Sequence, residues 1–432
     1  MSRSGWFRRQ QPLLVTSETS SSPAPATAPA TAPAKKKRGA ALTASAAALV
    51  IGAGIMIVAF AAPGSHASPV ASVNRADTSN RAAPARPHGP AAALQLVSTT
   101  PAGSAKGVNG ASPIRVQFSS PIAASSPMPA LSPQIAGKWT VQGDSAVFTP
   151  AVGYFENTRV TVAIPSGPSG IVSAAGASAG AGGTLGSAVS KSSFTTGSYS
   201  NLRLQQLLAQ LGYLPMTWTA KSGAAISRGN ARAELSAAYS APAGTFSWQG
   251  SYPWNLTSQW KAGSGNMIEQ GAIRAFESVH GLTMDGTAGP SVWSALLTAA
   301  AKSQVNPNGY TYALASQNSP ESLKIWHDGR LVFTSASNTG IPASPTADGT
   351  FPVFLRYYYQ IMKGTNPDGS KYADPVYYVA YFNGGDAVHY FPRYSYGSYQ
   401  SLGCVELPWD SAKKAWPYLT YGSLVTVTGP VA

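Results

Sequence analysis

A cysteine and a histidine are the side chains of this sequence best suited to covalent chemistry. Cys404 is the only cysteine among 432 residues, so it cannot form an intramolecular disulfide and its thiol is free. His389 precedes it in the chain. A cysteine nucleophile needs a base that holds it as a thiolate, and Gly403 lets main-chain amides turn toward a developing oxyanion. We therefore expect acyl-transfer chemistry, with His389 ending one strand and Cys404 on the next loop, so that the two meet across a hairpin.

The charge of the chain is basic but spread out. Lys and Arg number 30 against 16 Asp and Glu, which gives a formal net charge of +14. The only dense basic run is 35–38, without the base-stacking aromatics of a nucleic-acid binder, so we expect no nucleic-acid partner. A basic surface suits an anionic cell envelope. No Cys, His and Glu residues have the spacing of metal ligands, so we expect no metal and no cofactor.

The N-terminal region predicts an exported, membrane-anchored protein. Residues 1–38 are rich in Ser, Thr, Pro and Ala and predict a disordered cytoplasmic tail. Residues 39–62 carry no charge, and such a helix is long enough to cross about 30 Å of hydrocarbon. The basic run precedes this segment, so we expect everything after it to lie outside the cell, beginning with a linker at 63–93. The alternative is a cleaved signal peptide, because residues 65–67 have a small-x-small pattern.

Two regions with different periodicity follow the linker. Between 94 and 197, short β-branched runs separated by turn residues predict a small β-sandwich. Leucines at helical spacing over 202–211, and helical patterns at 272–279 and after Pro290, predict a small helical domain over 201–300.

The helical region contains a long insertion, residues 219–265, which is rich in aromatic side chains. These are Phe246, Trp248, Tyr252, Trp254 and Trp260. They could bind glycan, but the packing of an enlarged core is the commoner use of such a cluster, and we favour it.

The last region, residues 308–428, is rich in strand patterns and predicts a mainly β domain. Residues 327–330 predict a hairpin turn between its first strands, at 323–326 and 330–333. A short helix is expected from Asp410.

Three groups of motifs resemble known families. The sequence Ser-Leu-Gly-Cys at 401–404, after His389, resembles the L,D-transpeptidase catalytic domain of the YkuD type, whose signature is a His, then Ser-His-Gly-Cys and an Arg one residue on. Segments 328–332, 337–340 and 344–351 resemble the opening strands of that domain. Shorter motifs resemble bacterial Ig-like domains (100–103 and 148–150) and the three-helix peptidoglycan-binding domain (211–213, 272–276 and 285–293). We therefore expect a multidomain chain with a transmembrane helix, an Ig-like β-sandwich, a helical peptidoglycan-binding domain and a β-sandwich catalytic domain.

The resemblance implies a transferase that cross-links peptidoglycan and is a carbapenem target. Cys404 would attack the carbonyl of the third stem residue, release the terminal D-alanine and form a thioester, which the amine of a neighbouring stem resolves. His389 would carry the protons. The amides of Leu402, Gly403 and Cys404 would form the oxyanion hole, and Tyr390 would fix the tautomer of the imidazole.

Two positions depart from the family pattern, and both touch the expected site. Leu402 stands where His is usual, and Glu406, which with Ser401 is expected to contact substrate, stands where Arg is usual. A carboxylate near a cysteine raises the pKa of the thiol, and it also repels a carboxylate on the substrate. We expect Glu406 either to pair with a base such as Arg393 or to favour a donor stem with fewer free carboxylates.

Two other functions share these residues. One is an L,D-carboxypeptidase, in which water resolves the thioester. The other is a wall-binding protein whose catalytic domain is impaired by Leu402 and Glu406.

Overall fold

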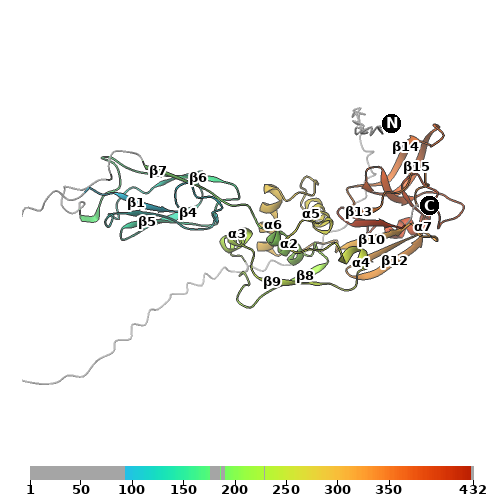
Figure 1. Cartoon of the computed structure of the whole chain (residues 1–432), viewed down its shortest axis with the longest axis horizontal. Helices are drawn as coiled ribbons and strands as arrows, with labels where there is room; N and C mark the ends of the chain where they lie inside the picture. The colour runs from blue at the N-terminus through green and yellow to red at the C-terminus, as the bar shows by residue number, and fades with distance from the viewer. Residues whose placement is uncertain (1–92, 176–184, 186–189, 228, 430–432) are drawn as a thin grey trace, which may run out of the picture. The chain divides into compact units, whose positions relative to one another are not determined.

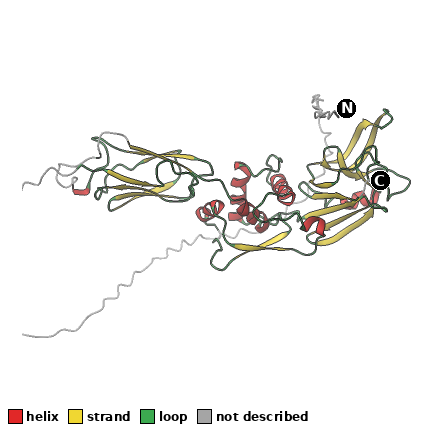
Figure 2. Cartoon of the chain, viewed as in Figure 1, coloured by secondary structure: helices red, strands yellow, loops and turns green. Residues whose placement is uncertain are grey.

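The computed structural model describes residues 93–175, 185, 190–227 and 229–429. The predicted tail, the transmembrane helix at 39–62 and nearly all of the linker lie outside these residues. Within the described part of the chain, no helix is long and apolar enough to cross a membrane. Figure 2 shows strands dominating the first and last regions of the described chain, with helices concentrated in the region between them in sequence.

The first region is a sandwich of two antiparallel sheets (Figure 1). One sheet has the order β1-β2-β5-β4 and the other β3-β6-β7. Their strands are β1 (Leu96–Thr100), β2 (Ile114–Phe118), β3 (Ala130–Ser132), β4 (Gly137–Gln142), β5 (Ser145–Pro150), β6 (Arg159–Ile164) and β7 (Ser190–Thr195). Alternate residues of β6, Val160, Val162 and Ile164, are buried, as expected for a strand with one face on the core.

The second region contains the predicted helices and a small hairpin. Its elements are α2 (Asn201–Gln210), β8 (Met216–Ala220), α3 (Ala231–Tyr239), β9 (Gly244–Trp248), α4 (Trp254–Thr257), α5 (Met267–Val279) and α6 (Pro290–Lys302). The side chains of Ser200 and Asn266 cap α2 and α5 by accepting a main-chain N–H, and Pro290 starts α6. Leu207, Leu208 and other apolar residues of one face of each helix form the core.

The aromatic insertion belongs mainly to this core. Phe246, Trp248, Tyr252 and Trp260 are partly buried against it, and the rings of Phe246 and Trp260 meet edge to face at 5.2 Å. Trp254 differs, because 77% of its surface is exposed. Packing therefore accounts for four of the five aromatic residues.

The last region consists of two sheets with a core between them. The strand orders are β12-β11-β10-β18-β13 and β14-β15-β16-β17. The elements are β10 (Thr311–Ser316), β11 (Ser322–His327), β12 (Arg330–Ala336), β13 (Gly349–Pro352), β14 (Leu355–Thr365), β15 (Lys371–Asn383), β16 (Asp386–Tyr390), β17 (Val405–Leu407), α7 (Trp409–Ala415) and β18 (Leu424–Thr428). The predicted turn at 327–330 is confirmed, because His327 pairs with Arg330 between antiparallel strands.

The helical region packs directly on this last region. Tyr310, Tyr312 and Leu424 belong to the same buried cluster as the cores of α2, α5 and α6. Gly271 of α5 lies against the turn at Gly422. A Cβ added to Gly422 would come within 2.3 Å of the Gly271 carbonyl oxygen. Neither position has room for a side chain, so this contact is made by backbone against backbone.

Candidate active site

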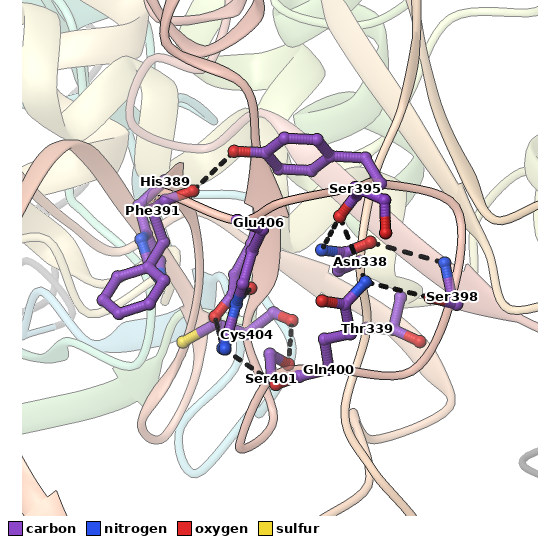
Figure 3. Close-up of polar contacts among 12 residues, drawn as sticks. Asn338, Thr339, His389, Phe391, Ser395, Ser398, Gln400, Ser401, Cys404 and Glu406 are labelled. Carbon is purple, nitrogen blue, oxygen red and sulfur yellow. Dashed lines mark hydrogen bonds and ion pairs between the residues drawn. The ribbon is translucent and has the colours of Figure 1, made fainter.

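The predicted nucleophile and base lie on one face of a parallel pair of strands. β16 and β17 run parallel, with His389 opposite Glu406. Cys404 precedes Glu406 by two residues, and the period of two along a strand places it on the same side. The expectation that Cys404 and His389 meet across a hairpin is therefore wrong: the chain crosses over between the two strands through residues 391–404. Figure 3 shows the Cys404 sulfur and His389 on the same side of Glu406.

Both side chains line a cavity of about 410 Å³. The antiparallel β14–β15 hairpin contributes another wall through residues such as Met362, Asp374 and Tyr381. A cavity of this size suits a small molecule or a peptide segment.

Cys404 is nearly buried, with 8% of its surface exposed. Its thiol donates a weak hydrogen bond to the carbonyl of Gly385 at 3.7 Å. Burial raises the pKa of the thiol to about 12, and the nearby carboxylates of Asp386 and Glu406 add to this, while a hydrogen bond from the Ala387 main chain acts against it. The resting sulfur is therefore a protonated thiol, which corrects the expectation of a preformed thiolate.

His389 is held in one tautomer. Its Nδ1 lies 2.9 Å from the carbonyl oxygen of Tyr390, and because a carbonyl only accepts, Nδ1 carries the proton. Burial lowers the pKa of the imidazole. The ring is therefore neutral near pH 7, with Nε2 free to accept a proton. The main chain of Tyr390, and not its hydroxyl, makes the contact with the ring.

Glu406 is paired with a base, as one of the two expectations proposed. Arg393 donates from Nε to Oε2 at 2.7 Å and from an Nη atom to Oε1 at 2.8 Å. That Nη also donates to the carbonyl of Gln400, and the guanidinium carbon lies 4.6 Å from the ring centre of Phe391. The carboxylate that replaces the usual Arg is thus neutralised within the cavity wall.

The loop before Cys404 is fixed by Ser401. Its side chain is fully buried, and its hydroxyl donates to the carbonyl of Cys404 at 2.6 Å and accepts from the amide of Gly403 at 3.3 Å. The hydroxyl of Ser401 therefore closes the turn, and contact of this residue with substrate stays a prediction. Gly403 has φ of +113°, which favours glycine.

Sequence reasoning missed two further residues of the site. Asn338 is fully buried; its Oδ1 accepts from the amides of Gly397 and Ser398, and its Nδ2 donates to the carbonyl of Ser395 (Figure 3). Asp386 lines the cavity beside Cys404. Segment 337–340 carried a motif signal but no indication of this role, and Asp386 carried none.

Comparison with known proteins identifies two domains. Residues 311–427 match the model of the L,D-transpeptidase catalytic domain, YkuD, and residues 90–196 match that of a bacterial Ig-like domain. No curated protein matches the chain.

Several solved structures are similar to the chain. An L,D-transpeptidase from Mycobacterium smegmatis is 13% identical, with 78% of this chain and 99% of that chain covered and a TM-score of 0.26. L,D-transpeptidase 3 from Mycobacterium tuberculosis, in complex with a faropenem-derived adduct, is 14% identical, with 78% and 98% covered and a TM-score of 0.26. The catalytic domain of the E. faecium L,D-transpeptidase is 26% identical over 27% of this chain and 96% of its own length, with a TM-score of 0.26.

The chain has an L,D-transpeptidase catalytic domain of the YkuD family, which follows a bacterial Ig-like domain.

Proposed function

We propose that this protein is a peptidoglycan L,D-transpeptidase that works through a thioester on Cys404. The observation that carries the proposal is the shared cavity of Cys404 and a neutral His389, on one face of β16 and β17 in the family-matched domain. A buried thiol beside a neutral imidazole is suited to proton transfer during attack.

Acylation then proceeds by general-base catalysis. His389 Nε2 takes the thiol proton while the sulfur attacks the carbonyl carbon of the third stem residue. The amides of Leu402 and Cys404 are the candidates to stabilise the oxyanion, because the Gly403 amide donates to Ser401. The bond to the nitrogen of the terminal D-alanine breaks, and the imidazolium returns the proton to that nitrogen. A second stem's amine then attacks the thioester and releases the sulfur.

The departures at Leu402 and Glu406 are compatible with activity. Leu402 would contribute through its main-chain amide, which every residue except proline supplies. The Glu406 carboxylate is neutralised by Arg393. These contacts favour a working enzyme over an impaired wall-binding protein.

We also propose that the enzyme acts outside the cell, anchored by the segment at 39–62, and that its helical region binds peptidoglycan. The charge pattern of the N-terminal sequence and the motifs at 211–213 and 272–293 support these two points.

The test uses the full-length protein with a carbapenem and with purified muropeptides. We expect intact mass spectrometry to show one adduct in the wild type and none in Cys404→Ala, and a tetrapeptide donor to give cross-linked dimers. Tripeptide monomers without dimers would indicate a carboxypeptidase. A wild-type thiol that forms no adduct would exclude the catalytic proposal.

A further inference from the structure

Asp386 lies beside the nucleophile, yet the acylation step does not use it. The Cys404 sulfur contacts both neighbours of Asp386 in the chain, through the carbonyl of Gly385 and the main chain of Ala387. Asp386 itself lies close to Gly403, because a Cβ on Gly403 would lie 2.6 Å from Asp386 Oδ1. The carboxylate is therefore held against the turn that presents the sulfur.

Within the described part of the chain, the carboxylate of Asp386 has no cationic partner. Its Oδ2 accepts from the side chain of Asn383 at 3.2 Å and from the amide of Ala347 at 3.4 Å, both of which are neutral donors. Among the ion pairs of the described residues, Glu406 has Arg393, whereas Asp386 has none. Asp386 is thus the carboxylate next to the sulfur whose charge is left for a ligand.

We propose that Asp386 is an acceptor-binding residue, whose Oδ1 receives the ammonium group of the incoming amine beside the Cys404 thioester. This inference rests on the proposed function. An anionic oxygen attracts an ammonium group but gives no comparable advantage to water. Asp386 would therefore favour cross-linking over hydrolysis of the same thioester.

The deacylation step balances with the residues present. The bound ammonium loses one proton to solvent, and the neutral amine nitrogen attacks the thioester carbonyl. A C–N bond forms and the C–S bond breaks. His389 Nε2 takes the second proton from the nitrogen and passes it to the sulfur, which restores the thiol and the neutral imidazole.

The experiment compares the wild type with Asp386→Asn, Asp386→Glu and Asp410→Asn in the full-length chain. The substrate is a disaccharide tetrapeptide donor with a peptide amine acceptor, and the readout is the ratio of dimer to hydrolysed tripeptide together with the acceptor KM. Asn keeps the acceptor oxygen for Asn383 and Ala347 but loses the charge. Asp410 is the control carboxylate, because it is exposed and is not among the residues that line the cavity.

We expect Asp386→Asn to lower the dimer-to-tripeptide ratio about tenfold and to raise the acceptor KM, which corresponds to the loss of one charge-assisted hydrogen bond. Its acylation by a carbapenem should be no slower than in the wild type, because removal of a negative charge eases ionisation of the thiol. Asp386→Glu should keep part of the preference for the amine over water, and Asp410→Asn should change the ratio less than about twofold, because its charge lies outside the cavity.

An unchanged ratio in an Asp386→Asn protein that still acylates would overturn this inference and leave the proposed function standing. Failure of the wild type to acylate would overturn the proposed function instead. A measurement that needs no variant guards against misfolding: the acceptor KM of the wild type should rise with added salt. A salt-independent KM would also count against the role of Asp386.

Discussion

Arg393 and Glu406 form a bidentate ion pair in the cavity wall, with nitrogen–oxygen distances of 2.7 and 2.8 Å. The Glu406 side chain is 5% exposed and that of Arg393 28%. A buried carboxylate that loses its partner is costly, because it is left without compensation. The pair thus connects the crossover loop to the strand that follows the nucleophile.

Arg393→Ala should therefore destabilise the protein by about 2–4 kcal/mol, the lower part of this range allowing for the partial exposure of Arg393. Urea unfolding would measure the change. The double variant Arg393→Ala with Glu406→Gln is the control and should recover part of the loss, since it removes the unpaired charge. A single variant within about 0.5 kcal/mol of the wild type would show that the ion pair contributes little.

The rate of acylation should depend on pH through His389. Because burial lowers the pKa of the imidazole below its usual 6.5, the ring stays neutral down to a pH under that value. The rate of carbapenem adduct formation should be flat near pH 7 and should fall only at a pH below 6.5. A decrease in the acylation rate toward acid pH with a midpoint above pH 6.5 would contradict a buried, neutral base.

The same shift predicts the pH dependence of stability. The unfolded chain binds a proton on His389 at a higher pH than the folded chain does, so stability should fall as the pH drops below 6.5. His389→Gln should lessen this acid sensitivity, measured as the slope of unfolding free energy against pH. An unchanged slope would assign the acid sensitivity to other groups.

Glu277 in α5 should have the opposite effect. Burial and the nearby Asp285 raise its pKa from 4.5 to about 7, although its Oε2 accepts from the amide of Gly286 at 2.9 Å. The folded state therefore holds this proton more tightly, and stability should fall as the pH rises from 4.5 through 7, by about 3 kcal/mol. Thermal unfolding of Glu277→Gln at pH 8 should show a protein at least as stable as the wild type. A clear loss of stability would mean that the carboxylate is stabilised by contacts other than these.

Asn338→Ala should loosen the loop that leads to the nucleophile. Its Oδ1 accepts from two loop amides, and burying both without a partner costs about 1–3 kcal/mol each. We expect carbapenem acylation to slow at least about tenfold, because Cys404 is held less firmly. An Asn338→Ala protein that is acylated at the wild-type rate would contradict this role.

The strands and helices with regular apolar spacing could be predicted from the sequence, but their pairing could not. Strand β6 and helix α2 have a clear period, because one face of each is buried. Strand β14 was missed as a long strand, since Tyr357, Tyr358 and Tyr359 are all exposed and give no alternation. The short separation of β16 from β17 suggested a hairpin, whereas hydrogen bonds from Asn338 fold the intervening loop into a crossover.

In the candidate site too, residue types could be predicted from the sequence, but the surroundings of each residue in space could not. Cys404 and His389 were identified by residue type and spacing, and Arg393 by its charge. Asp386 was missed because its importance depends on which groups surround it in space. The protonation of the thiol likewise depends on burial, which spacing does not reveal.

The backbone contact between Gly271 and Gly422 has a practical consequence. The helices cover Tyr310, Tyr312 and Leu424. A fragment that begins near residue 308 would expose these side chains as an apolar surface patch. Such a fragment would tend to aggregate, so a shortened enzyme suitable for crystallisation or screening should begin ahead of Tyr199.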